Sequence, residues 1–356
     1  MSVESTKQRQ RQLLWSALFL VILALLLYAT TILLQPSAGG AGGNPWKGYL
    51  RQPTGSIDVL HIGNSHMYCT WQPTTAWQEA GITSWNIGAG SISAENCLLW
   101  LKTALRTQKP QVVAIEISAF FSETPANPQF KADELAMMQM PLSPETIQMV
   151  TPKLEPNLWG GGAFLIPTLR YSKNYKDFSR ESVQNFWHSR EKEWAGGAEL
   201  IVSRELATTS KQTETQADVS EDMQAFRANA HTLSTMIELC QAQNAKVLLW
   251  EAPLPSLVQT QKLCQVKDFT ARIDTNDSVT VFSFAELSGE PFDATDWGDE
   301  EHLNVWGAEK ATVQLLAQIT PLLSGVSHSE SATNQWDTYT QKTTATIKQR
   351  AASISH

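Results

Sequence analysis

The longest run of apolar residues lies close to the start of the chain. Residues 13–34 read LLWSALFLVILALLLYATTILL, 22 positions without a formal charge. At about 1.5 Å per residue, a helix of this length crosses a hydrocarbon core of about 30 Å. Lys7, Arg9 and Arg11 precede the run, against a single Glu4. The positive-inside rule therefore predicts a cytoplasmic N-terminus, with the chain after the run outside the cell.

This run predicts a transmembrane anchor, with residues 1–12 in the cytoplasm. A cleaved signal peptide is the alternative, because the small residues Ser37 and Ala38 stand near a candidate cleavage point. We favour the anchor, since the run exceeds the roughly 7 to 15 apolar residues of a signal-peptide core. The sequence PSAGGAGGNP follows directly, and we expect residues 35–54 to be a flexible linker.

Beyond the linker, short apolar runs alternate with stretches in which apolar residues have helical spacing. Runs typical of strands occupy residues 57–62, 84–87, 112–117, 246–250 and 279–284. Helical patterns occupy about 74–80, 93–108, 223–241 and 305–323. This alternation predicts an α/β fold, in which helices cover both faces of a mostly parallel sheet. Such sheets bind ligands beyond the carboxyl ends of their strands.

The alternation is interrupted over residues 121–220, where Pro, Met, Trp and a triple glycine alternate with polar stretches. We expect an insertion of irregular and helical pieces there, and we interpret it as a candidate lid. After Gly325 the chain is rich in Ser, Thr and Gln, without an apolar face. Residues 326–356 are therefore expected to be a mobile tail, and residues 55–325 a single extracellular domain.

Composition narrows the class of protein. Of 356 residues, 42% are hydrophobic and 17% charged, which excludes wholesale disorder. The balance of 27 basic and 35 acidic side chains gives a net charge of -8 and argues against a nucleic-acid partner. The chain has four cysteines and no C-x-x-C pair, which excludes a zinc ribbon. Outside the cell these cysteines are either paired or buried thiols, and Cys240 with Cys264 would close the shorter loop.

The first of three chemically informative motifs is IGNSHMY at residues 62–68. It places Ser65 between a predicted strand and a predicted helix, in a turn that exposes the hydroxyl beside the helix N-terminus. This position suits a serine nucleophile, although a serine there can also simply cap the helix. Met67 occupies the place of the second glycine in G-x-S-x-G, which disfavours the nucleophile elbow of α/β-hydrolases.

The other two motifs supply complementary groups. WNIGAGSIS at residues 85–93 contains Gly88 and Gly90, which let backbone N–H groups approach a ligand as an oxyanion hole requires, or form a plain turn. Asp299 and His302 stand three residues apart before the last predicted helix. A short turn there would place the carboxylate against Nδ1 and leave Nε2 to accept a proton. The alternative is a solvated acidic turn with an incidental histidine.

In this order along the chain, the three motifs resemble those of the SGNH (GDSL-type) hydrolase family. Ser65 matches the family's first block, Gly88 or Gly90 the second, and Asp299 with His302 the fifth. The resemblance implies a three-layer α/β/α flavodoxin-like SGNH-hydrolase fold with a parallel sheet, preceded by one N-terminal transmembrane helix. The chain is more similar to membrane-anchored bacterial members that read G-[ST/N]-S-H. These include the proteins that work beside membrane-bound O-acyltransferases in teichoic-acid D-alanylation and exopolysaccharide acylation.

One block of the family departs from its usual pattern. The third block, usually G-x-N-D, gives the oxyanion hole an Asn side chain, whereas the matching strand end here reads Glu116-Ile117-Ser118. Ser118 is a candidate replacement donor, and Asn64, where the family usually has Asp, is a second candidate. Losing one donor costs about a hundredfold in rate. The departure therefore implies weak hydrolysis, transfer to a special acceptor, or a non-catalytic member.

The resemblance implies an acyl esterase or O-acyltransferase that acts on cell-envelope polysaccharide or teichoic acid. His302, oriented by Asp299, would take the proton of Ser65, whose oxygen attacks an ester or thioester carbonyl. Backbone N–H groups of Ser65 and of Gly88 or Gly90 would hold the oxyanion. The alternative is a catalytically weak or inactive SGNH-like protein that binds glycan or scaffolds a membrane-bound O-acyltransferase.

Two further histidines lie near Ser65 in the sequence. His66 is a candidate contact for the acyl donor, or has a structural role at the helix start, while His61 is expected to pack within the first strand. A zinc site from His61, His66 and Asp299 is disfavoured, because no H-E-x-x-H or similar signature is present. We expect no metal and no cofactor. The expected partners are the membrane and a cell-envelope polymer or small acyl ester.

Overall fold

The computed structural model describes residues 3–34, 44–121, 136, 139–150, 191–203, 219–254, 259–273, 278–287 and 292–354. The chain divides into two compact units. Residues 1–37 and 150–188 form one, and residues 38–149 and 189–356 form the other. Helix α1 (Val3–Leu34) belongs to the first unit, whereas every strand and all the predicted site residues belong to the second.

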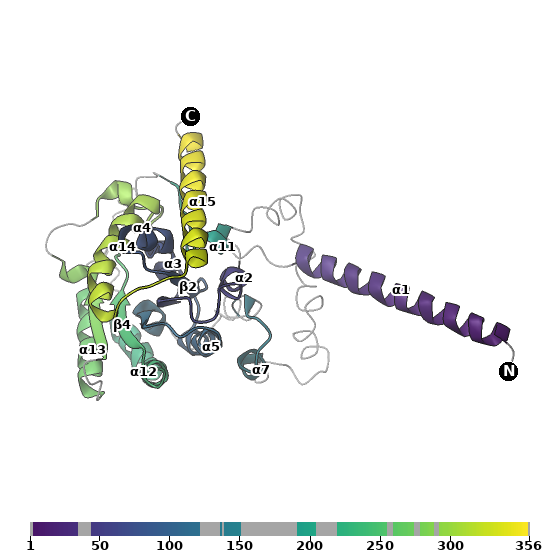
Figure 1. Cartoon of the computed structure of the whole chain (residues 1–356). Coiled ribbons are helices and arrows are strands. Elements are labelled where there is room, and N and C mark those ends of the chain that lie inside the picture. The colour runs from purple at the N-terminus through teal and green to yellow at the C-terminus, as the bar shows by residue number, and fades with distance from the viewer. Residues whose placement is uncertain are drawn as a thin grey trace. The chain divides into compact units, whose positions relative to one another are not determined.

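Helix α1 carries the apolar run near the N-terminus (Figure 1). Its stretch Gln8–Thr31 has a mean hydropathy of 2.4 and is long and apolar enough to cross a membrane, and none of it is buried inside the protein. The hydroxyls of Thr30 and Thr31 donate to backbone carbonyls one turn earlier, at 2.8 Å, which satisfies them without water. A helix of this kind fits either a signal anchor or a signal sequence.

A five-stranded parallel sheet forms the centre of the second unit. Its strands are β1 (Val59–Gly63), β2 (Ser84–Gly88), β3 (Val112–Glu116), β4 (Lys246–Glu251) and β5 (Val279–Ser283). They are ordered β2-β1-β3-β4-β5. Every residue of β1, β2 and β3 is buried, which explains why these strands read as apolar runs and not as alternating patterns. The predicted α/β class and its parallel sheet are confirmed.

Helices pack in pairs beside this sheet. Helix α5 (Ala94–Ala104) contacts α12 (Val219–Gln241), and α4 (Pro73–Ala80) contacts α14 (Val305–Ile319). Figure 1 shows β2 and β4 between these two pairs. Helix α13 (Gln259–Arg272) packs against β5 and was not predicted, because polar residues dominate its sequence.

The main core lies between the sheet and α14. Large buried side chains there include Trp71, Trp250, Leu315 and Ile319. The four cysteines contribute no disulfide, since Cys69, Cys97 and Cys240 are buried without a cysteine partner and Cys264 is exposed. Burial raises the pKa of the Cys240 thiol to about 12, so this thiol stays protonated at neutral pH.

Two segments that we expected to be flexible are packed parts of the domain. Helix α2 (Pro45–Tyr49) lies in the predicted linker and buries Trp46 and Tyr49, with the Trp46 ring 5.3 Å from that of Trp100. Helix α15 (Glu330–Ile354), yellow in Figure 1, occupies the predicted tail and buries Trp336 beside Trp85.

Both expectations were therefore wrong over the residues that the structure describes. The reason is the same in both places. A few aromatic side chains supply most of the burial, in sequences whose other residues are small or polar. Such isolated anchors leave no periodic apolar pattern for a sequence argument to detect.

Part of the predicted insertion also belongs to the domain. Residues 191–203, which begin with α11 (Glu191–Trp194), cover the edge strand β2: the Asn86 N–H donates to the Gly196 carbonyl at 2.8 Å. Gly197 has φ +83°, and a Cβ there would lie 2.3 Å from the Asn86 carbonyl oxygen, so glycine is required. Glu145 of helix α7 (Pro144–Val150) forms an ion pair with Arg106, with the carboxylate oxygen 2.6 Å from the guanidinium nitrogen. Residues 122–135, 137–138, 151–190 and 204–218, and with them the predicted lid, lie outside the described residues.

Candidate functional site

The carboxyl ends of β1, β2 and β3 meet at one edge of the sheet. Gly63 is in register with Gly88, and the preceding residue of β1 with Ile115 of β3. A Cβ on Gly88 would lie 2.2 Å from the Gly63 carbonyl oxygen. A Cβ on Gly63 would lie 2.8 Å from the Cβ of Glu116. Glycine at both positions therefore lets the three strand ends approach each other closely.

Ser65 is the first residue of α3 (Ser65–Thr70), directly after β1. Asn64 caps the helix: its backbone is extended, and its Oδ1 accepts the His66 N–H at 2.9 Å. Ser65 is partly exposed, and its hydroxyl makes no hydrogen bond within the described part of the chain. The predicted position of this serine, between a strand and a helix, is confirmed.

Asp299 and His302 contact each other in the turn before α14. The Nδ1 of His302 lies 2.9 and 3.0 Å from the two carboxylate oxygens of Asp299. The His302 Nε2 is buried and has no hydrogen-bond partner among the described residues. The predicted geometry, with the carboxylate on Nδ1 and Nε2 open to a proton, is present.

The environment of Asp299 keeps its carboxyl ionised. Burial raises the pKa, but hydrogen bonds from the Glu301 N–H and from His302 outweigh it, so that the pKa of Asp299 is lowered overall. The backbone N–H groups of Glu301 and His302 both donate to Oδ1 at 2.8 Å. An ionised carboxylate on Nδ1 favours the tautomer of His302 that has its proton there and a lone pair on Nε2.

A ring contact joins the serine turn to this pair. The His66 ring stacks on that of His302, with centroids 5.2 Å apart and planes at 28°. Since His66 directly follows Ser65, the contact brings the first and third motifs into one site. No hydrogen bond joins Ser65 to His302. Catalytic hydrogen bonds are often long in the absence of substrate.

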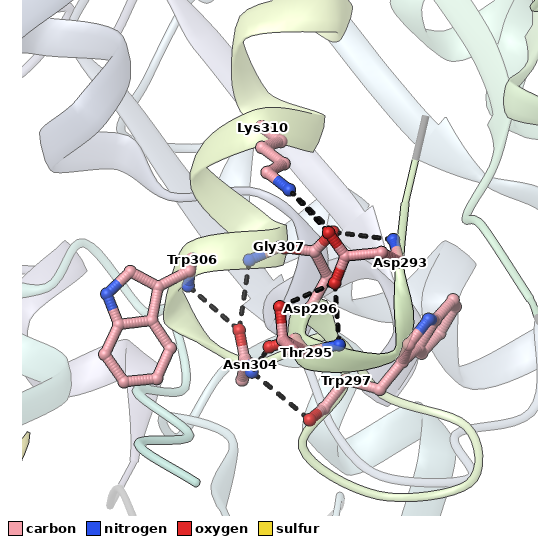
Figure 2. Close-up of polar contacts among 8 residues, drawn as sticks. All are labelled: Asp293, Thr295, Asp296, Trp297, Asn304, Trp306, Gly307 and Lys310. Atoms are coloured by element: carbon pink, nitrogen blue, oxygen red, sulfur yellow. Dashed lines mark hydrogen bonds and ion pairs between the residues drawn. The ribbon is translucent and has the colours of Figure 1, made fainter. Parts of the chain in front are cut away.

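Asn304 lies shortly after Asp299 and His302 in the chain, and Figure 2 shows its contacts. Its Oδ1 caps α14 by accepting the N–H groups of Trp306 and Gly307, each at 3.0 Å. Its Nδ2 donates to the carbonyl oxygens of Thr295 at 2.7 Å and Trp297 at 3.2 Å. One side chain thus ties the start of α14 to the start of the loop that carries Asp299 and His302.

Further contacts close the base of the same loop. Trp297 pairs with Leu303 in an antiparallel bridge, and the Gly298 N–H donates to the His302 carbonyl at 2.8 Å. Figure 2 also shows Lys310 of α14 against Asp296, whose carboxylate is almost fully buried, at 2.8 Å. Sequence reasoning missed Asn304 and Asp296; an Asn directly before a helical pattern is the signal that indicates a cap.

Replacing Asn304 with alanine is expected to lower the free energy of unfolding by about 2 kcal/mol, because it removes a helix cap and leaves buried carbonyl groups unpaired. Asn304→Asp keeps the capping acceptor but sets a buried carboxylate oxygen against these carbonyl oxygens, so its loss should be at least as large. Urea unfolding of the full chain, monitored by tryptophan fluorescence, measures the free energy of unfolding of both variants. Equal stability of the alanine variant and wild type would show that this residue does not hold the loop.

Asn64, Ser118 and Glu116 form a chain of hydrogen bonds behind the serine turn. The Asn64 Nδ2 donates to the Ser118 Oγ at 2.7 Å. The Ser118 hydroxyl donates to Glu116 Oε2, and the Ser118 backbone N–H donates to Oε1 at 3.1 Å. In this arrangement the protons of Ser118 are both donated to Glu116, so this candidate replacement donor has none left for an oxyanion. Asn64 has a second side-chain N–H without a partner among the described residues, and it remains a candidate donor.

Residues of the 191–203 segment flank the other side of the site. The Glu199 N–H donates to the Tyr68 carbonyl at 2.9 Å, and a Cβ on Gly298 would lie 2.4 Å from Ile201. Burial, with smaller contributions from Cys69 and Glu199, raises the pKa of Tyr68. A Cβ on Gly90 would lie 3.4 Å from the Tyr68 hydroxyl, so this glycine belongs to the same neighbourhood.

His61 has the packing role that we expected. It is fully buried on β1, where its ring stacks on Trp71 at 4.3 Å and meets the edge of Trp250 at 5.9 Å. Burial lowers its pKa to about 3. The described residues contain no group of three or more His, Cys, Asp or Glu side chains placed to hold a metal ion, so the alternative zinc site gains no support.

Comparison with known proteins assigns no family. No protein-family model and no curated protein matches this sequence. The contacts of Ser65, His66, Asp299 and His302 are therefore the basis on which a function is assigned.

Proposed function

We propose that the protein is a membrane-anchored, extracellular serine acyl esterase or O-acyltransferase of the SGNH type. The observation that carries this proposal is the Asp299–His302 pair, with a partnerless Nε2, beside the turn that begins with Ser65. The strand order β2-β1-β3-β4-β5 supports it, because flavodoxin-like sheets have this order and bind ligands at their carboxyl edge.

Acylation of Ser65 is the first half of the reaction. His302 Nε2 takes the hydroxyl proton while Oγ attacks the carbonyl carbon of an ester or thioester, and Asp299 stabilises the imidazolium. The oxyanion is held by the N–H groups of Ser65 and of Gly88 or Gly90, together with the second N–H of Asn64. The imidazolium then returns the proton to the leaving alcohol or thiol as the acyl–serine bond is completed.

Deacylation is the second half. A sugar hydroxyl, a polyol phosphate or water loses its proton to His302 and attacks the acyl-serine carbonyl. The imidazolium then returns this proton to Ser65 Oγ as the acyl–serine bond breaks. The anchor α1 would keep the domain at the outer face of the membrane, where cell-envelope polysaccharide or teichoic acid is within reach. The resemblance adds a membrane-bound O-acyltransferase as a partner. Every step uses groups of this chain and its substrates, without a cofactor.

The test is covalent labelling of the full chain in detergent micelles with a fluorophosphonate probe, which reacts with activated serines. We expect one adduct, located at Ser65 by peptide mass spectrometry, and hydrolysis of p-nitrophenyl acetate by the same sample. Ser324→Ala, which removes an exposed serine outside the site, should label like wild type. The intact mass of membrane-extracted protein tests the anchor, because a cleaved signal peptide would remove α1.

A catalytically inactive protein that binds glycan or scaffolds an acyltransferase is the second candidate. The absence of a hydrogen bond between Ser65 and His302 favours it. A folded wild type that gives neither adduct nor ester cleavage would contradict the enzyme proposal and support this alternative.

A further inference from the structure

We infer that Glu116 is a positioning residue for the nucleophile turn, acting on Ser65 through Ser118 and Asn64. This inference rests on the proposed function, since it concerns the residue that would be acylated. Glu116 is the last residue of β3. It belongs to none of the three motifs, and sequence reasoning assigned it no role. Its burial and its contacts give it one.

The Glu116 carboxylate is held firmly at the end of its strand. The side chain is fully buried, a position that is costly for a carboxylate unless hydrogen bonds compensate. It accepts the Ser118 N–H at 3.1 Å and the Ala252 N–H at 3.4 Å, and it also accepts the Ser118 hydroxyl. These donors come from the chain segments that follow β3 and β4, so the carboxylate is fixed relative to the sheet.

The hydrogen bonds continue from this carboxylate to the serine turn. Ser118 donates its only hydroxyl proton to Glu116, so its oxygen can only accept from Asn64, as it does at 2.7 Å. The amide of Asn64 is thereby oriented with its nitrogen toward Ser118. Its oxygen then faces the His66 N–H, which it accepts at 2.9 Å. The hydrogen bonds of the Asn64 amide to Ser118 and to the His66 N–H therefore fix the backbone turn on both sides of Ser65.

Because Glu116 accepts both the hydroxyl and the backbone N–H of Ser118, it decides which way every member of this chain of hydrogen bonds points. If the Asn64 amide were reversed, its oxygen would meet the Ser118 oxygen and its nitrogen would meet the His66 N–H, and neither pair forms a hydrogen bond while Ser118 donates to Glu116. Glu116 therefore determines where the second Asn64 N–H and the Ser65 backbone N–H lie.

A double-mutant cycle tests this chain on the full-length protein in detergent. We expect Ser118→Ala and Glu116→Gln each to lower kcat for p-nitrophenyl acetate about tenfold with KM unchanged, because the turn loses its fixed orientation. Ser118→Thr keeps the hydroxyl and should restore kcat to within about twofold of wild type. The Asn64→Ala/Ser118→Ala double variant should be no slower than Asn64→Ala alone, since both act through one amide.

The results of these experiments distinguish failure of the inference about Glu116 from failure of the proposed function. Multiplicative losses in the double variant, or an unchanged kcat in Ser118→Ala, would overturn the inference while leaving the proposed function intact. A wild type without adduct or turnover would overturn the proposed function, and the inference with it. Ser118 is partly exposed, so its variants decide the matter if Glu116→Gln does not fold. Lowered thermal stability with unchanged kcat would show that the chain is structural only.

Discussion

Ser65→Ala and His302→Ala are each expected to reduce ester hydrolysis by about ten-thousandfold or more, to the level of buffer, and the double variant no further. In the proposed mechanism the nucleophile and its base act as a unit, so removing either one removes the whole contribution. Initial rates with p-nitrophenyl acetate on the full chain measure this, and circular dichroism checks that each variant is folded. A double variant that is slower than both single variants would mean that the two residues act independently.

Asp299→Asn should also show a large loss, about ten-thousandfold. The amide still fills the space beside Nδ1, but it carries no negative charge to stabilise an imidazolium and can hold the ring in the wrong tautomer. Glu300 is the adjacent acidic residue and is exposed, which makes Glu300→Gln a matched control. Similar losses in both variants would point to the general acidity of the loop and not to the pair.

Acidification is expected to remove stability through His61. Its pKa is about 3 in the folded protein and about 6.5 in the unfolded chain, so the unfolded state binds more protons between these values. The stabilisation is fully present above about pH 6.5 and is lost as the pH falls toward 3, at about 1.4 kcal/mol per unit and about 5 kcal/mol in total.

Urea unfolding between pH 7.5 and about 4.5 measures this slope before most carboxylates titrate. His61→Phe keeps an aromatic ring on Trp71 and has no proton to bind, so its slope should be shallower than that of wild type by about 1.4 kcal/mol per unit. His231 is exposed on α12, and His231→Asn should keep the wild-type slope. The same pH dependence of the free energy of unfolding in His61→Phe and wild type would contradict the assignment of this effect to His61.

Local patterns were sufficient where a structure depends on neighbours in the sequence. The strands around Ile62, Ile87 and Ile115 are buried on both faces, so their apolar runs identified them. Asp299 and His302 are three residues apart, and the spacing alone suggested their contact. Gly63 and Gly88 marked strand ends for the same reason, although only the structure shows which atoms their missing side chains would meet.

Other features depend on residues that are distant in the sequence. The Asn64–Ser118 hydrogen bond joins positions 54 residues apart, and the contact of Trp336 with Trp85 joins two separate helical and strand segments. Neither leaves a periodic signal. Helix α13 was missed because its buried face is narrow, with Leu263 and Val266 among mostly polar residues. Pairings of this kind follow from the tertiary fold, which a single sequence pattern does not contain.

Contacts between helix α15 and residues near the start of the domain determine how the domain would respond to local unfolding and to proteolysis. Its Tyr339 hydroxyl lies 3.3 Å from the Gln52 amide, just after α2, and its Asp337 accepts the indole N–H of Trp77 at 2.8 Å. Contacts of α15 thus reach both α4 and the residues that directly follow α2. Local opening at either end should expose both, so that amide exchange in α2 and α15 rises together. Proteolysis near the C-terminus would then loosen the chain after α2 as well, because it would remove the contact of Tyr339 with Gln52.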